Sequence, residues 1–183
     1  MKTQILDADG MRRTINRLTH ELVEKNKDFD NLVLVGIRTR GEFLAYRVAR
    51  LIKEIEKKEI PVGVLDITLY RDDLHGRLDQ PLLKSTEILF DLKGKTVVLV
   101  DDVLFTGRTI RSALNALMDI GRPAMIELLV LVDRGHRELP IKADFVGKNI
   151  PTSRTQKIVV SMTEKDTEDA IYVSNADGKE SEQ

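Results

Sequence analysis

The stretch VVLVDDVLFTGRTIRSAL, residues 97–114, decides the fold. Four apolar residues lead directly into two adjacent acids, Asp101 and Asp102, and the turn Thr-Gly-Arg-Thr follows at 106–109. A continuous apolar run of this kind is typical of a strand buried on both faces of a parallel sheet. Residues 108–120 then have the pattern of a helix. The stretch therefore predicts a buried strand that ends in paired acids and passes through a small turn into a helix.

The rest of the chain continues this alternation. Further strands are predicted at 32–37, 62–70, 126–132 and 157–162, and amphipathic helices at 43–58 and at 11–27, where Met11, Ile15, Leu18 and Leu22 form one stripe. Such alternation is typical of an α/β domain with a mostly parallel sheet. Ligands of these sheets bind beyond the carboxyl ends of the strands. Asp101, the segment 36–41 and Asp133 all fall at such ends.

Composition limits the class of protein. The chain has 183 residues, is 42% hydrophobic and 32% charged, and has a net charge of −1, which by itself predicts no nucleic-acid partner. It has no cysteine, which excludes disulfides and thiolate metal sites. No apolar run approaches the roughly 20 residues of a membrane span, and the N-terminus lacks a secretory signal. We expect a cytoplasmic protein with a single domain over 1–175 and a disordered tail at 176–183.

The turn after the paired acids has the features of a phosphate site. Thr106, Gly107 and Thr109 combine hydroxyl donors, close backbone approach and the positive end of a helix. Asp101 and Asp102 would repel the same phosphate, so they need a metal ion or hydroxyl groups instead. A ribose 5-phosphate satisfies both parts. The alternatives are a surface turn with incidental acids and a receiver-type acidic pocket for Mg²⁺, although the latter would not need the phosphate turn.

A second basic loop follows another predicted strand. In GIRTRGEFLA, residues 36–45, Arg38 and Arg40 flank Thr39 between two glycines. Arginines bind phosphate oxygens in bidentate fashion and could neutralise a pyrophosphate. The alternative is a solvated loop with chance basic residues.

The stretch from 97 to 109 closely resembles the phosphoribosyl pyrophosphate (PRPP) signature of type I phosphoribosyltransferases, and the loop at 38–40 resembles their pyrophosphate loop. The resemblance implies a mostly parallel central sheet flanked by helices, with a small hood and a mobile loop. In that family the acids hold the ribose hydroxyls and the turn holds the 5-phosphate. The residues expected to bind PRPP or UMP are Val97, Val98, Leu99, Val100, Asp101, Asp102, Val103, Leu104, Phe105, Thr106, Gly107, Arg108 and Thr109.

The family also implies how the reaction is assisted. The segment 69–84 resembles its mobile catalytic loop, with Tyr70, Arg71 and Arg77 as candidates, whereas a plain hairpin is the alternative for any one of them. Closure of such a loop excludes water from an oxocarbenium-like transition state. Mg²⁺ is expected to be held through PRPP rather than directly by protein side chains. The sequence shows no convincing general base.

One subfamily matches over roughly residues 4–175: the pyrimidine operon attenuation regulators with uracil phosphoribosyltransferase activity. Its members convert uracil and PRPP to UMP and pyrophosphate, sense UMP or UTP, and bind their operon's leader mRNA. We expect the base pocket in the hood segment after the strand 126–132, with Asp133, Arg134 and Ile158. Purine salvage enzymes of the family have a lysine where Asp133 stands, so purines become unfavourable. Phe105 stands where the subfamily often has tyrosine.

The subfamily also implies a homodimer or larger homo-oligomer. The alternative function is a salvage phosphoribosyltransferase for another base, with no role in RNA binding. These two functions differ in the base transferred and in whether a leader transcript is bound.

Candidate RNA contacts come from two segments. Arg13, Arg17 and His20 lie opposite the apolar stripe of the first helix, and six Lys or Arg but only two acids lie between 134 and 157, among them Lys148 and Arg154. The solvated side of an amphipathic helix is the alternative for the first group. Because aromatic content is only 4%, contacts would go mainly to phosphates rather than by base stacking.

Overall fold

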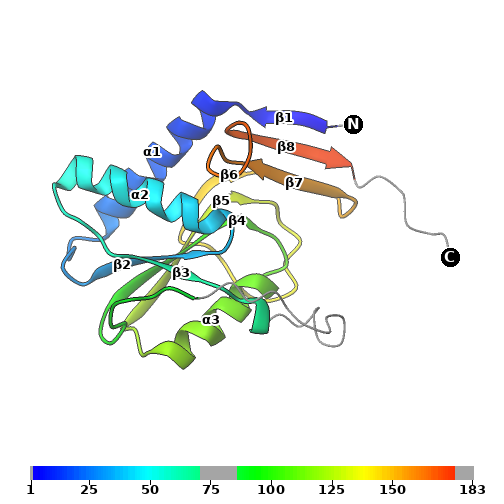
Figure 1. The fold of residues 1–183 in the computed structure, drawn as a ribbon. Coiled ribbons are helices and arrows are strands. Elements are labelled where there is room, and N and C mark those ends of the chain that lie inside the picture. The colour runs from blue at the N-terminus through cyan, green and yellow to red at the C-terminus, as the bar shows by residue number, and fades with distance from the viewer. Residues whose placement is uncertain (1, 71–85, 176–183) are drawn as a thin grey trace.

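The computed structural model describes residues 2–70 and 86–175. Two sheets make up its frame (Figure 1). The larger has the strand order β3-β2-β4-β5-β6, and every neighbouring pair in it is parallel. Its strands are β2 (Leu32–Ile37), β3 (Val62–Leu65), β4 (Thr96–Leu104), β5 (Met125–Asp133) and β6 (Phe145–Asn149). The predicted α/β class with a parallel central sheet is confirmed.

Three helices cover the two faces of this sheet. Helices α1 (Ala8–Lys25) and α2 (Arg40–Glu56) lie on one face, and α3 (Arg108–Ile120) lies on the other (Figure 1). Alternate strand residues explain the two layers: Leu34 and Val98 join the core under α1 and α2, whereas Val35 and Leu99 join the core under α3. Within the described ranges, no helix is long and apolar enough to cross a membrane.

The second sheet is small and antiparallel, and it joins the two ends of the described chain. Its order is β1 (Lys2–Leu6), β8 (Ala170–Asn175) and β7 (Gln156–Ser161). Val160, Met162 and Ile171 bury their side chains in the same core as α1 and α2. This sheet is therefore the hood, and it sits on the helical layer rather than forming a separate core.

Several expectations need correction. The hood was expected after β5, but β6 in that segment is an edge strand of the main sheet, because Phe145 buries its ring and Val146 pairs with Val130. The strand expected at 62–70 ends at Leu65, where Asp66 starts a hydrogen-bonded turn into the short 3-10 helix η1 (Thr68–Tyr70). The first helix begins at Ala8 instead of residue 11, because the Asp7 side chain caps it by accepting from Gly10 N at 2.7 Å.

Two glycines allow α2 to begin directly against the sheet. A Cβ atom at Gly36 would lie 2.4 Å from Glu42 Cα, and one at Gly41 would lie 2.4 Å from Val100 O. Both neighbours are backbone atoms, so they cannot move aside by a rotamer change. The first turn of α2 thus rests on the carboxyl ends of β2 and β4.

We predict that Gly41→Ala destabilises the protein by about 1–3 kcal/mol, because the added methyl group has no space between α2 and β4. Thermal denaturation measures the change. Gly10→Ala is the control: its methyl group would meet only side-chain atoms, Leu6 Cδ2 at 3.0 Å and the capping Asp7 Oδ1 at 3.1 Å, and alanine is favoured over glycine in a helix by roughly 1 kcal/mol. Equal melting temperatures for Gly41→Ala and wild type would contradict the close packing.

Candidate active site

A cavity of about 250 Å³ lies at the carboxyl ends of β2, β3 and β4. It brings together both predicted phosphate segments, although they are some sixty residues apart in the sequence. Its lining consists of Ile37, Arg38, Thr39, Arg40, Asp66, Ile67, Thr68, Asp101, Asp102, Val103 and Thr109. A single ligand could therefore contact the basic loop, the paired acids and the start of α3 at once.

The paired acids lie near the end of β4, where Asp101 is buried and Asp102 is half-buried. Asp101 is only 7% exposed, and its Oδ1 accepts a hydrogen bond from Asp102 N at 2.9 Å. Burial and the neighbouring Asp102 charge raise the pKa of Asp101 well above its ordinary value. Burial also raises the pKa of Asp102, but the positive charge of Arg40 opposes this. Both carboxyl groups therefore have raised pKa values, and the charge of Arg40 opposes the shift only at Asp102.

The other predicted residues of the signature fall into two groups, the buried side chains of β4 and the turn before α3. Val97, Val98, Leu99, Val100 and Leu104 are fully or almost fully buried, so their side chains form the core rather than the cavity wall. Gly107 has φ 92°, a left-handed conformation that favours glycine, and it starts α3. Thr106 O accepts from Glu138 N at 2.9 Å, and Arg108 Nε donates to Glu138 at 2.7 Å. The segment after β5 thus fixes the turn, and Thr109 reaches the cavity.

The basic loop between β2 and α2 is held by ion pairs. Arg38 lies 3.6 Å from Glu42 and 3.2 Å from Glu87, and the peptide bond between Arg38 and Thr39 is cis. Arg40 forms a two-pronged pair with Asp166 of the turn between β7 and β8. Both arginines are therefore fixed by carboxylates at the rim of the cavity.

Sequence reasoning missed one wall of the cavity, formed by Asp66, Ile67 and Thr68. Asp66 Oδ1 accepts from Thr68 N at 2.9 Å and from Thr68 Oγ1 at 2.6 Å, an Asx turn at the end of β3. The signal was available: an aspartate and a threonine two residues apart directly follow a parallel strand.

The predicted loop residues have different outcomes. Tyr70 is anchored to α3, because its hydroxyl donates to Asp119 at 2.9 Å and its carbonyl accepts from Ser112 Oγ at 2.8 Å. Arg71 and Arg77 lie outside the described residues.

The three predicted base-pocket residues lie at the end of β5, in the loop after it and in β7. Asp133 accepts hydrogen bonds from Gly135 N at 2.9 Å and from Arg137. Its carboxylate therefore holds the loop that follows β5. Arg134 is 6% exposed, and its guanidinium carbon lies 3.9 Å from the centre of the Phe105 ring. Ile158 lies in β7 and packs against the core under α1 and α2. Phe105 thus supports a buried cation with its ring, a contact that requires no hydroxyl.

The predicted RNA residues surround the junction of α1 and β6. Arg13 and His20 are exposed on α1, and Lys148 is exposed on β6. Arg17 connects the two elements by donating to Val146 O at 3.3 Å and to Gly147 O. Arg154 is exposed in the connection between β6 and β7.

The described side chains include no group of three or more His, Cys, Asp or Glu that could hold a metal ion. Asp101 and Asp102 are the acids nearest to one another in the cavity, and two carboxylates alone do not make a closed metal site.

The chain matches a family model described as the phosphoribosyl transferase domain over residues 1–167. It is 58% identical over 172 residues to a protein named bifunctional protein PyrR from Pelotomaculum thermopropionicum, covering 94% of this chain and 95% of that protein. The protein of the same name from Thermus thermophilus is 58% identical over 177 residues, covering 97% and 98%. That from Roseiflexus sp. is 61% identical over 163 residues, covering 89% of each.

Solved structures with the same fold are more distant in sequence. A hypoxanthine-guanine phosphoribosyltransferase from Bacillus anthracis superposes with a TM-score of 0.70 at 18% identity, covering 94% of this chain and 97% of that chain. The hypoxanthine phosphoribosyltransferase of Trypanosoma cruzi gives the same TM-score and identity, covering 94% and 96%. At this identity the likeness shows the fold and says nothing about the base.

We predict that Asp101→Asn raises the melting temperature at neutral pH by at least about 2 °C, roughly 1 kcal/mol for a chain of this size. The raised pKa of Asp101 means that the folded state binds its proton more tightly than the unfolded state. That stabilisation is complete below the ordinary aspartate pKa and is lost as pH rises toward the folded pKa. The neutral amide has no such loss, so its advantage grows from pH 4 to pH 7.

Melting curves at several pH values measure this difference. Asp102→Asn is the matched control and should gain less, because Arg40 favours the ionised form of Asp102. An Asp101→Asn variant that is less stable than wild type at every pH would contradict the buried, raised-pKa environment.

Proposed function

The chain belongs to the phosphoribosyl transferase domain family and, within it, to the bifunctional PyrR proteins, and from this we propose both of its functions. As an enzyme it transfers the phosphoribosyl group of PRPP to uracil, giving UMP and pyrophosphate. As a regulator it binds the leader mRNA of a pyrimidine operon in a manner that depends on UMP or UTP. We also expect it to work as a homodimer or larger homo-oligomer.

The observation that carries the enzyme proposal is the single cavity that joins the basic loop to the paired acids and Thr109. PRPP has three matching parts: a 5-phosphate for the turn at the start of α3, ribose hydroxyls for Asp101 and Asp102, and a diphosphate for Arg38 to Arg40. Both carboxyl groups line the cavity and are proposed to hydrogen-bond to these two hydroxyls.

The reaction breaks the bond between the anomeric carbon and the diphosphate oxygen and forms a bond from that carbon to a uracil ring nitrogen. The leaving diphosphate takes the bonding electrons, and the proton of the uracil nitrogen is released to solvent. Positive charge develops at the anomeric carbon in between, and Asp102, which lines the cavity, is proposed to help stabilise it. The chain's main contributions are therefore positioning and electrostatics.

Mg²⁺ is proposed to arrive with PRPP, since the described side chains provide no closed metal site. When bound it would supply charge neutralisation of the diphosphate. Among the described residues, the acids that line the cavity are Asp66, Asp101 and Asp102.

Base selection is proposed to involve the loop that starts at Asp133. Its carboxylate accepts from Gly135 N and Arg137, and it offers no donor to a purine carbonyl oxygen. Arg134 is buried against Phe105, and burial lowers the pKa of its guanidinium. Ile158 of β7 is the proposed apolar contact. The similarity to the bifunctional PyrR proteins favours uracil over the salvage of another base, and the identity of the accepted base tests this.

We predict that wild type transfers phosphoribose to uracil and not to hypoxanthine, guanine or adenine, and that Asp101→Asn or Thr109→Ala lowers the uracil rate more than tenfold. Each tenfold corresponds to about 1.4 kcal/mol of transition-state stabilisation. Labelled bases at saturating PRPP measure all four reactions. Efficient transfer to a purine would favour the salvage alternative, and near-normal rates in both variants would refute the sugar-phosphate assignment.

The RNA proposal rests on the basic surface where α1 meets β6. We define it by Arg13, Arg17, His20 and Lys148, all exposed, and add Arg154, which is exposed in the connection between β6 and β7. Arg17 already donates to the carbonyls of Val146 and Gly147 and pairs with Glu21, so replacing it would also loosen α1 from β6. Arg13 and Lys148 give the cleaner test.

We predict that the double variant Arg13→Glu, Lys148→Glu weakens binding to a pyrimidine-operon leader hairpin and lowers the salt slope by roughly 1.5, as two lost phosphate contacts require. Uracil transfer should be unchanged. Arg12→Glu is the matched control, since Arg12 lies on α1 beside α2 and pairs with Asp9. Filter binding with and without UMP measures the effect. Equal binding of a scrambled hairpin by wild type would remove the regulatory role.

A further inference from the structure

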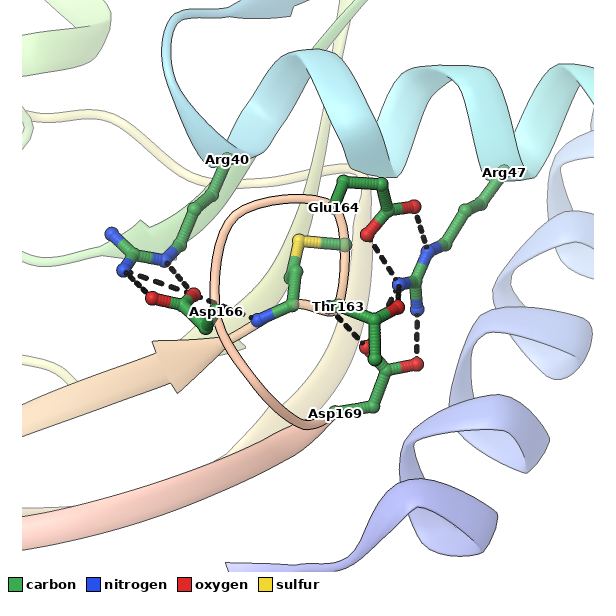
Figure 2. A network of polar contacts seen from close by, with 7 residues as sticks. Arg40, Arg47, Thr163, Glu164, Asp166 and Asp169 are labelled. Carbon is green, nitrogen blue, oxygen red and sulfur yellow. Dashed lines mark hydrogen bonds and ion pairs between the residues drawn. The ribbon is translucent and has the colours of Figure 1, made fainter.

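Two arginines of α2 hold the turn between β7 and β8 (Figure 2). Arg40 and Arg47 are seven residues apart, two helical turns, and therefore project from the same face of α2. Their partners are the acids of one short segment, Glu164, Asp166 and Asp169. The small sheet is thus attached to the helix that begins at the basic loop of the cavity.

Asp166 grips Arg40 along one edge of the guanidinium. Arg40 Nη2 lies 3.1 Å from each carboxylate oxygen, and Nε lies 3.3 Å from Oδ2. Asp166 is itself fixed, because its Oδ2 also accepts from Met162 N at 2.9 Å. Both charged groups are partly buried, with side-chain exposures of 29% and 27%. A paired guanidinium in such a setting keeps one orientation of its plane.

The pair with Asp166 leaves the Nη1 side of the Arg40 guanidinium for another ligand. Within the described residues, the hydrogen bonds of Arg40 all go to Asp166 through Nε and Nη2, so Nη1 is the donor that they do not use. Arg40 also lines the cavity, and its charge favours the ionised form of Asp102. The unused donor, Nη1, therefore belongs to an arginine that already affects the paired acids of the cavity.

Arg47 behaves differently on the same face of the helix. Its side chain is 15% exposed, and its Nε, Nη1 and Nη2 donate to Glu164, Asp169 and Thr163. It lines a separate hollow between α1 and α2 rather than the cavity of the paired acids. Arg47 therefore only attaches the turn to α2. Arg40 differs because it also lines the cavity and has a donor that the turn does not use.

We propose that Asp166 is a positioning residue that orients Arg40 for the diphosphate of PRPP, an inference that rests on the proposed phosphoribosyl transfer. The small sheet thereby contributes to the pyrophosphate subsite without touching the ligand. A correctly held guanidinium loses less conformational freedom when it binds a phosphate oxygen, so the affinity for the diphosphate depends on Asp166.

The test uses four variants of the full chain. Asp166→Asn keeps an acceptor for Met162 N but turns an amide donor toward Arg40. Glu164→Gln is the matched control, because it breaks an ion pair of the same turn on Arg47 only. Arg40→Lys keeps the charge and cannot form the two-pronged pair. The fourth variant combines Asp166→Asn with Arg40→Lys. Measurements are the KM for PRPP, kcat, and the dissociation constant of pyrophosphate with Mg²⁺ by calorimetry.

We expect Asp166→Asn to raise both the KM for PRPP and the pyrophosphate dissociation constant about tenfold, with Glu164→Gln within twofold of wild type. In the Arg40→Lys background the same change should add less than threefold, because the residue it positions is gone. Asp166→Glu, which keeps the charge, should recover part of the loss and serves if the amide variant folds poorly.

Three results would overturn the proposal: wild-type constants in Asp166→Asn, an equal loss in Glu164→Gln, or full multiplication of the two effects in the combined variant. Calorimetry separates this proposal from the enzyme assignment. Suppose that wild type binds pyrophosphate more tightly than Asp166→Asn does but transfers nothing to uracil. That result would refute the transfer reaction and leave the positioning role of Asp166 standing.

Discussion

The close approach of the first turn of α2 to the carboxyl ends of β2 and β4 is the constraint on which the rest of the structure depends. Gly36 and Gly41 permit it, since a side chain at either position would meet backbone atoms at 2.4 Å. The same approach places Arg40 at the rim of the cavity that Asp101 and Asp102 line. One packing requirement therefore sets both the stability of the sheet–helix layer and the distance between a basic loop and two acids.

Burial gives these acids their distinct properties. A strand that continues to Leu104 carries Asp101 into the core, where burial and the adjacent charge raise its pKa, while Arg40 opposes the shift at Asp102. The site is thus costly to fold and useful for binding hydroxyl groups, a conflict that is common at functional sites. The second sheet adds a further level, because Asp166 reaches Arg40 from a strand connection 126 residues later in the chain.

Patterns within short stretches of sequence predicted those strands and helices that are determined by neighbouring residues. Residues 32–37 and 108–120 match β2 and α3 because apolar runs and a glycine at the helix start are local signals. The meeting of 38–40 with Asp101 and Asp102 could also be expected, since parallel strands bring their carboxyl ends together. The composition of the hood could not be expected from the sequence, because β1 and β8 pair across the length of the chain. For the same reason, no local pattern indicated Asp166 or the attachment of Arg17 to β6.

The central claim is that one ligand spans the basic loop and the turn at the start of α3, and amide hydrogen exchange with and without PRPP and Mg²⁺ tests it most directly. The account predicts that exchange slows together at 38–42 and at 106–110 in a single saturable transition, with smaller changes in the amino-terminal halves of β2 and β4. Protection of one segment without the other, or two transitions at different PRPP concentrations, would contradict it.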